Sequence, residues 1–383
     1  MTAMRVERAP SSSLLARPES GSWRSFDIQL AFYALALAII GLLMAWTNST
    51  EGGPLAAGST FTRGLMWFAV AIVAFAISAA FDYRWLRTFS WLLYLTNIGL
   101  LLVTMAIGIE INGAQRWVSL GGLTFQFSEI SKVLMIAVLA TFLARRADRI
   151  KSLSTIIGVG MLTLPPFVLI MIQPDLGTAL VLVAIAAGAL FLAGGSLRWM
   201  AVIVAGALAT LPVIWSLLLP YQQLRVISFL DPTSDPSGAG FQVAQAQIAV
   251  GSGGIFGKGL TAGASSGLLP VQSTDFAFAV LLEELGFIGG LVVFLLFIGL
   301  IWRILVIGWR SESVFGVAFA GGTAAMIIFQ ILVNAGMVAG IMPVTGIPLP
   351  FITHGGASLV STAISLGLLQ SINIRRARAP GAG

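Results

Sequence analysis

Long apolar runs, each about as long as a lipid bilayer is thick, recur along most of this sequence. Of the 383 residues, 57% are hydrophobic and only 9% are charged, whereas a soluble domain is roughly one quarter charged. Only helices and closed barrels satisfy their backbone hydrogen bonds in lipid, and unalternating runs of roughly 20 residues favour helices. The sequence therefore predicts an all-α polytopic membrane protein.

Ten such runs can be placed along the chain. They cover about residues 28–47, 63–81, 86–107, 127–144, 152–172, 174–193, 197–219, 276–302, 313–341 and 349–373. Of the 21 lysines and arginines, 16 fall on the side that also holds the N-terminus; the other five are Arg63, Arg116, Lys132, Arg225 and Lys258. Because cytoplasmic loops carry the excess of Lys and Arg, this division predicts about ten transmembrane helices with both termini cytoplasmic.

The remaining segments complete the predicted organisation. Residues 1–26 are polar and basic without an apolar core, which is typical of a disordered cytoplasmic tail and not of a cleavable signal peptide. Residues 27–374 form one membrane domain, and residues 375–383 form a short basic cytoplasmic tail. Between helices seven and eight, residues 220–275 are too polar and too rich in Gly and Pro to span. They predict a large, structured extracytoplasmic loop on the bilayer face.

The residue types limit the chemistry of any site. The chain has no cysteine, which excludes disulfides and thiolate metal sites, and its one histidine, His354, cannot build a histidine metal cluster. The net charge of +6 follows from the cytoplasmic arginines, so it does not indicate nucleic-acid binding. No dedicated metal site is predicted.

Two groups of charged residues within the early runs need an explanation, because an ionisable side chain in lipid usually faces a cavity, a partner or a pathway. Glu129 and Lys132 are spaced i,i+3, so they share one helix face and can pair. The pair can be a structural salt bridge, part of a polar cavity, or both. Asp175, between Pro174 and Gly177, is typical of a helix start, and we interpret it as a cap.

The eighth run carries three acids. Glu283 and Glu284 point about 100° apart on a helix, so they cannot easily share a partner, and we interpret them as packing or cavity residues. Asp275 lies at the membrane boundary, where it can cap the helix or act as a general base at the mouth of a polar cavity. Spacing alone leaves both interpretations open.

Prolines and glycines break the ninth and tenth runs near their outer ends. The breaking residues are Pro343, Gly346, Pro348, Pro350, Gly355 and Gly356. Broken backbone at membrane depth is tolerated only where protein buries it or where it lines a cavity. The pattern predicts a cavity that opens outward, near Asp275.

Five blocks in order resemble the SEDS family (shape, elongation, division and sporulation). They are "NGAQRWVSLGGLTFQFSEISK" from Asn112, "QPDLGTAL" from Gln173, "RVISFLDPTSDPSGAGFQVAQAQIAVGSGGIFGKG" from Arg225, "LPVQSTDFAFAVLLEELG" from Leu269 and "NAGMVAGIMPVTGIPLPFITHGGAS" from Asn334. The resemblance extends from about Asp27 to the last span. "MPVTGIPLPF" favours the RodA-type elongation branch over the FtsW-type division branch.

The resemblance implies a peptidoglycan glycosyltransferase that polymerises lipid II at the outer face of the membrane, surrounded by membrane lipids and beside a class B penicillin-binding protein. It implies that Asp275 is the catalytic acid or base. It also implies that Trp117 belongs to the site and that Glu129 and Lys132 form a salt bridge beside a central cavity. Ser273 replaces a histidine of the family pattern, and His354 stands where tyrosine is common.

This reaction requires a sugar hydroxyl to attack an anomeric carbon that carries a lipid diphosphate. The protein must accept a proton and neutralise the departing charge, and we expect Asp275 to accept the proton. A divalent cation such as Mg²⁺, where one is needed, would be shared with the diphosphate. The candidates for neutralising the diphosphate are Arg225, Lys258, Arg116 and Lys132, with solvation at the surface as the alternative for Arg225 and Lys258.

Two other functions fit parts of the pattern. A lipid II flippase also needs broken helices and charges within the membrane, but its path must cross the midplane, whereas the polar blocks here gather on the outer side. A non-catalytic scaffold for the penicillin-binding protein is disfavoured because Asp275 is present. Polymer formation in detergent, where no second compartment exists, distinguishes the enzyme from the flippase.

Overall fold

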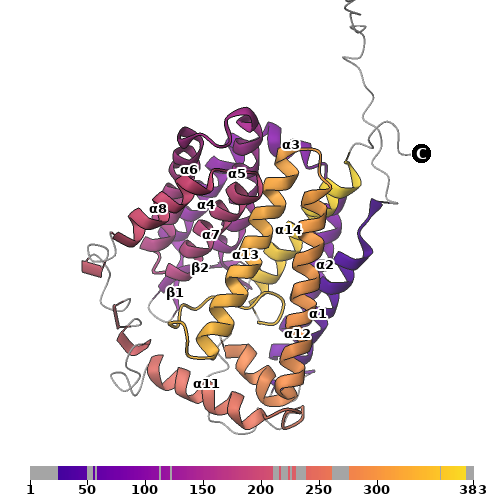
Figure 1. The fold of residues 1–383 in the computed structure, drawn as a ribbon. Coiled ribbons are helices and arrows are strands. Elements are labelled where there is room, and N and C mark those ends of the chain that lie inside the picture. The colour runs from indigo at the N-terminus through magenta and orange to yellow at the C-terminus, as the bar shows by residue number, and fades with distance from the viewer. Residues whose placement is uncertain are drawn as a thin grey trace, which may run out of the picture.

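The structure is a computed structural model that describes residues 25–49, 55–56, 58–111, 114–120, 123–209, 215–216, 223–224, 227–229, 239–260, 276–353 and 355–376. These residues form a bundle of helices that run side by side (Figure 1). In the described part of the chain, eight helices are long and apolar enough to cross a membrane. They are α1 (Ile28–Thr47), α2 (Thr60–Ala80), α4 (Ser90–Ile107), α5 (Phe127–Arg145), α6 (Leu153–Ile172), α12 (Ala277–Trp309), α13 (Val314–Val338) and α14 (Gly356–Ile374).

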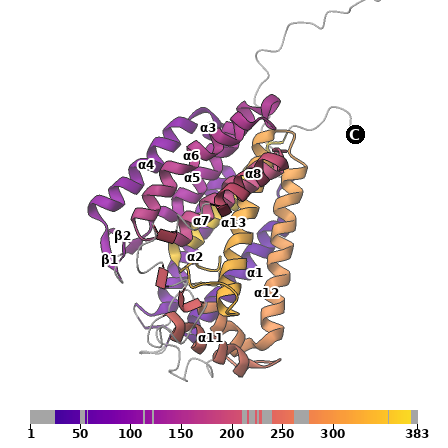
Figure 2. The same ribbon diagram turned by 60° about the vertical axis from the view of Figure 1, so that its left-hand side comes forward.

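Two shorter apolar helices complete the set predicted from the sequence. α7 (Leu176–Leu192) packs against α13 inside the bundle, and α8 (Leu197–Ala209) lies at the periphery beside α6 (Figure 2). The all-helical polytopic fold is thereby confirmed. Part of the seventh predicted span, residues 210–214 and 217–219, lies outside the described residues.

Three predicted boundaries differ from the structure. The third run, 86–107, joins two helices, because α3 (Arg84–Thr88) ends before α4 begins. The eighth span extends to Trp309 instead of residue 302. The tenth begins at Gly356 instead of 349, because the chain before it contains three prolines and takes an irregular path. Proline lacks the backbone N–H that a helix interior needs.

Three helices form the centre of the bundle: α5, α13 and α14 are the most enclosed of the eight spans. α13 packs closely on α7 through small residues. A Cβ atom built on Gly188 would lie 2.2 Å from Ala325 Cβ, and one built on Gly321 would lie 2.5 Å from the Gly188 carbonyl oxygen. Small residues let helix backbones approach closely in a membrane, where packing replaces the hydrophobic drive for association.

The C-terminal end of α14 ties several helices together at one end of the bundle. The Gln370 amide accepts from the Asp27 backbone N–H at 2.9 Å and donates to the Asp27 carbonyl at 2.7 Å. Asp27 caps α1 and forms an ion pair with Arg303 of α12. Ser371 donates to the Phe81 carbonyl at the end of α2. This end also carries α3 (Figure 1).

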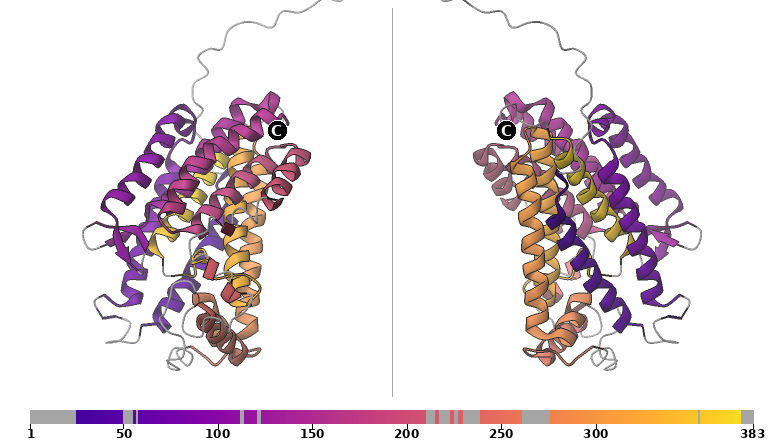
Figure 3. Two further views of the ribbon diagram at one scale, coloured as in Figure 1. Left: turned by 90° about the vertical axis from the view of Figure 1, so that its left-hand side faces the viewer. Right: turned by 90° about the vertical axis from the view of Figure 1, so that its right-hand side faces the viewer.

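The opposite end holds two features that the sequence did not predict. A small antiparallel sheet has the order β1 (Ile109–Ile111), β2 (Ala114–Leu120), β3 (Leu123–Phe125). Within the predicted long loop, α11 (Ala239–Gly253) lies at this end of the bundle against α12, which runs the full height of the bundle (Figure 3). The loop is therefore partly helical, although most of residues 220–275 lie outside the described residues.

Replacing Gly188 by alanine tests the close crossing of α7 and α13. The new methyl group overlaps Ala325, and such overpacking costs about 1–3 kcal/mol. We expect Gly188→Ala to lower the midpoint of thermal unfolding of the detergent-purified protein. Gly160→Ala on α6, where a Cβ meets no atom within 4 Å, is the matched control and should leave the midpoint unchanged or raise it. Equal midpoints for the two variants would contradict the crossing.

Candidate active site

The sequence-predicted site residues fall into two groups. Asp275, Arg225, His354 and Ser273 lie outside the described residues. The other five are described, at or just inside the end of the bundle that holds the sheet and α11: Arg116 and Trp117 on β2, Glu129 and Lys132 at the start of α5, and Lys258 in the turn after α11. Phe276, which directly follows Asp275 in the chain and immediately precedes α12, is buried.

Arg116 and Trp117 are neighbours on β2. Their side chains point to opposite faces of the strand, because successive residues of a strand alternate. Arg116 Nη1 lies 3.5 Å from Asp175 Oδ1, and its side chain keeps 24% of its surface exposed. Arg116, one of the cations predicted to neutralise a diphosphate, is therefore also the ion-pair partner of a buried carboxylate.

Asp175 is the junction of three elements. It caps α7, since its Oδ1 accepts from the Thr178 backbone N–H at 3.2 Å, which confirms the capping interpretation. Its Oδ2 accepts from Gln126 Nε2 at 2.8 Å, just before α5 begins. Together with Arg116, these contacts fix the sheet against the first turns of α5 and α7.

The predicted ion pair of α5 is present. Lys132 Nζ lies 2.6 Å from Glu129 Oε2, and both side chains are 3% exposed or less. Ser361 of α14 donates to the same carboxylate oxygen at 3.3 Å. A buried charge is tolerated when it is paired and hydrogen-bonded, so this contact lets both charges enter the centre of the bundle.

The irregular segment between α13 and α14, described over residues 339–353 and 355, is partly folded into the protein. Its apolar side chains Val344, Ile347 and Leu349 are buried. Asn334 of α13 donates to the Ile347 carbonyl at 2.8 Å, and a Cβ on Gly177 of α7 would lie 2.7 Å from Ile347 Cγ1. The prediction that prolines break the ninth and tenth helices is confirmed, and the break packs beside the start of α7.

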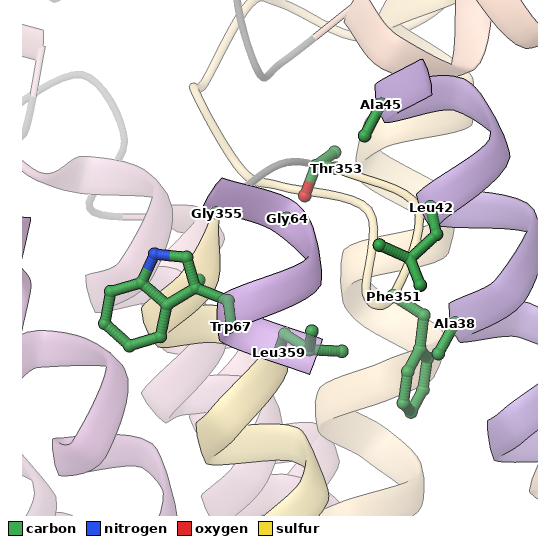
Figure 4. Close-up of a pocket in the computed structure, with 11 residues that line it drawn as sticks. Ala38, Leu42, Ala45, Gly64, Trp67, Phe351, Thr353, Gly355 and Leu359 are labelled. Carbon is green, nitrogen blue, oxygen red and sulfur yellow. The ribbon is translucent and has the colours of Figure 1, made fainter. Parts of the chain in front are cut away.

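A groove lies between α1, α2 and the end of this irregular segment (Figure 4). Its cavity volume is only about 30 Å³, and it is lined mostly by apolar or glycine residues, including Leu42, Trp67 and Phe351. Its one side-chain hydroxyl, that of Thr353, donates to the Leu349 carbonyl. The lining residues offer no charge, so the groove itself supplies no acid or base.

Metal ligands are not gathered in the described part of the chain. No group of three or more His, Cys, Asp or Glu side chains lies together there. Three of the described carboxylates near the site, Asp175, Glu129 and Glu283, each bind a cation of the protein. These three carboxylates do not form a cage for a divalent ion.

Comparison with known proteins identifies the family. Residues 28–378 match the model of the cell cycle protein family of FtsW, RodA and SpoVE. The chain belongs to this family, the SEDS proteins.

The SEDS relatives match along nearly the whole chain. The peptidoglycan glycosyltransferase MrdB of Escherichia coli K12 is 37% identical over 353 residues, which cover 91% of this chain and 94% of MrdB. The FtsW protein of Alkalilimnicola ehrlichii is 38% identical over 366 residues, 92% of this chain and 90% of FtsW. Since both branches match equally well, the preference for the RodA-type branch stays a prediction.

A solved structure shares the fold. One chain of a peptidoglycan synthase complex, described as coordinating polymerization and crosslinking, superimposes with a TM-score of 0.77 at 33% identity. The match covers 92% of this chain and 98% of that chain. The helical architecture of this SEDS protein is therefore that of a known peptidoglycan synthase component.

Sequence reasoning missed two contacts of this SEDS site. The partners of Arg116 and Lys258, Asp175 and Glu283, are distant in sequence, so no helical spacing relates them. The sequence does hold a signal that the backbone around Lys258 packs closely against another segment. That signal is the group of glycines Gly253, Gly254, Gly257 and Gly259.

The buried pair of α5 can be tested by a double-mutant cycle on stability. Lys132→Met leaves Glu129 charged and unpaired in the interior, and breaking such a pair costs about 3–5 kcal/mol. The double variant Glu129→Gln/Lys132→Met leaves no charge and should recover most of that loss. Thermal unfolding in detergent is the measurement, and a double variant no more stable than Lys132→Met would contradict this account.

Proposed function

We propose that this chain, a SEDS peptidoglycan glycosyltransferase of cell elongation or division, polymerises lipid II at the outer face of the cytoplasmic membrane, with Asp275 as the general base. The observation that carries the proposal is the family match across residues 28–378 together with the position of Asp275 two residues before α12. Asp275 takes the proton from the sugar hydroxyl that attacks the anomeric carbon of a second lipid II. Diphosphate leaves with the lipid.

The orientation in the membrane follows from where the basic residues gather. Arg145 donates to the Arg87 carbonyl, and Arg375 lies 3.9 Å from Asp82, so cation-rich turns meet at the end that holds α3 and the last turn of α14. Cytoplasmic loops carry the excess of Lys and Arg. We assign that end to the cytoplasm, with both tails, residues 1–26 and 375–383. Residues 220–275 then form the large extracytoplasmic loop of the 27–374 membrane domain.

Charge neutralisation is assigned to cations on the outer side. Arg225 and Arg116 bind the diphosphate, and Trp117, which points to the other face of β2, contacts another part of the substrate. The partly exposed guanidinium of Arg116 supports this, since it has donors beyond the one directed at Asp175. Lys258 is considered separately below, because its ammonium already binds Glu283. A class B penicillin-binding protein is the partner that crosslinks the new strands.

Replacing Asp275 by asparagine tests the base. General-base catalysis contributes about 10²–10⁴-fold, so Asp275→Asn should lower the rate of glycan polymer formation at least about 100-fold. The protein is purified in detergent with its co-expressed class B penicillin-binding protein and supplied with lipid II, and polymer is measured on gels. Asp148→Asn, an exposed acid in the turn after α5, is the control. Normal amounts of polymer from Asp275→Asn would refute the role of Asp275. Absence of polymer from the wild-type protein would instead favour the alternative function, a lipid II flippase.

The diphosphate assignment is tested by substrate affinity. Arg225→Ala removes one cation, and loss of a charge-assisted contact of about 1.5–3 kcal/mol should raise the KM for lipid II roughly 10- to 100-fold. Arg63→Ala is the matched control, since Arg63 is an exposed arginine predicted on the same side of the membrane. An unchanged KM in Arg225→Ala would remove Arg225 from the diphosphate site.

A further inference from the structure

α12 is broken into two helical segments at Gly286. Gly286 has φ 66° and ψ −168°, which is not helical. The short segment of α12, residues 277–285, begins two residues after Asp275, and the long segment, residues 287–309, continues the span. A break of this kind releases backbone N–H and C=O groups from the helical ladder, and they need new partners where water is scarce.

The turn after α11 supplies those partners. We call residues 254–259 the joint turn. Its Lys258 N–H donates to the Glu283 carbonyl at 2.9 Å, and its Gly259 N–H donates to the Glu284 carbonyl at 3.1 Å. On the other side of the break, the N–H groups of Phe287 and Ile288 donate to carbonyls of the joint turn at 2.9 and 3.1 Å. The joint turn therefore bridges both segments of α12.

Glycine is required on both sides of this contact. Gly257 has φ 81°, and a Cβ there would lie 2.1 Å from the Glu284 carbonyl oxygen. A Cβ on Gly286 would lie 2.3 Å from the Gly257 nitrogen. A residue with a side chain would therefore force the two backbones apart, which would lengthen the bridging hydrogen bonds.

One side-chain contact closes the same joint. Lys258 Nζ lies 2.6 Å from Glu283 Oε1, with the lysine side chain 37% exposed and the glutamate 3%. Ser252 Oγ of α11 lies 3.5 Å from the same oxygen. The lysine neutralises a carboxylate that is otherwise buried on the short segment, and a buried charge without a partner destabilises its surroundings.

We propose that Lys258 is a positioning residue: through its ion pair with Glu283 it fixes the short segment of α12, and with it the place from which Asp275 acts. This inference rests on the role of Asp275 proposed above. The sequence-based expectation is different, namely that Lys258 neutralises the diphosphate. Loss of a positioning lysine lowers kcat, and the loss depends on Glu283. Loss of a diphosphate ligand raises KM, whether or not Glu283 is present.

The test is a cycle of Lys258→Ala, Glu283→Gln and the double variant, assayed with lipid II on the full chain co-purified with its partner. Lys258→Ala leaves Glu283 charged and unpaired, so kcat should fall about tenfold with KM within about twofold, since displaced catalytic groups lower the rate. Adding Glu283→Gln removes the unpaired charge and should restore kcat to within about threefold of wild type. Lys258→Arg, which keeps the pair, should stay near wild type.

Three outcomes would overturn the proposal. The first is a KM that rises in Lys258→Ala and stays raised in the double variant, which would make Lys258 a substrate ligand. The second is a kcat of Lys258→Ala that Glu283→Gln does not restore. The third is a Lys258→Ala variant with wild-type kcat and KM. Lys151→Ala, an exposed lysine in the turn between α5 and α6, is the control for loss of a lysine.

Hydrogen exchange provides a readout that does not depend on catalysis. We expect faster amide exchange across residues 276–288 in Lys258→Ala than in wild type, and wild-type exchange in Asp275→Asn. If Asp275→Asn keeps full activity, Asp275 is not the base. The exchange rates of Lys258→Ala still test whether the joint turn holds the short segment of α12. If exchange in Lys258→Ala equals that of wild type, the joint fails whatever the role of Asp275.

Discussion

Lipid offers no hydrogen bonds, and this constraint explains how each irregular or charged part of the bundle is built. The Glu129 carboxylate enters the interior only with Lys132 and Ser361 around it. The non-helical segment between α13 and α14 buries Val344, Ile347 and Leu349, and its Ile347 carbonyl accepts from Asn334 of α13. The break at Gly286 is bridged by the joint turn. In each case a partner within the protein replaces the water that a soluble protein would use.

The two ends of the bundle are held together in different ways. At the end assigned to the cytoplasm, side chains of α14 bind backbone groups at the start of α1 and the end of α2, and Arg303 binds the cap of α1. These contacts fix helix ends that packing alone would leave free to slide. At the other end the contacts come from the sheet, the joint turn and the irregular segment. The relative positions of the helices are thus fixed at one end of the bundle, and the proposed reaction is assigned to the other end.

What the sequence predicted well depended on local periodicity. The spans are recognisable because lipid thickness dictates their length. The Glu129–Lys132 ion pair could be predicted because i,i+3 spacing puts the two residues on one helix face. The cap at Asp175 could be predicted because capping has a local sequence pattern. α11 and the sheet escaped notice because the helix is rich in Gly, Ala and Gln and two of the strands are only three residues long. Asp275 and Arg225 stay predictions, since they lie outside the described residues.

The three acids of the eighth span show why long-range contacts decide function where spacing cannot. Glu283 and Glu284 are adjacent and equally buried, yet Glu283 faces the joint turn and binds Lys258, while its neighbour points about 100° away. A charged base in the middle of a straight span would lie in lipid at high cost. The break at Gly286 separates the short segment of α12 from residues 287–309, so the proposed base, which precedes the short segment in the chain, does not have to follow the axis of the long segment.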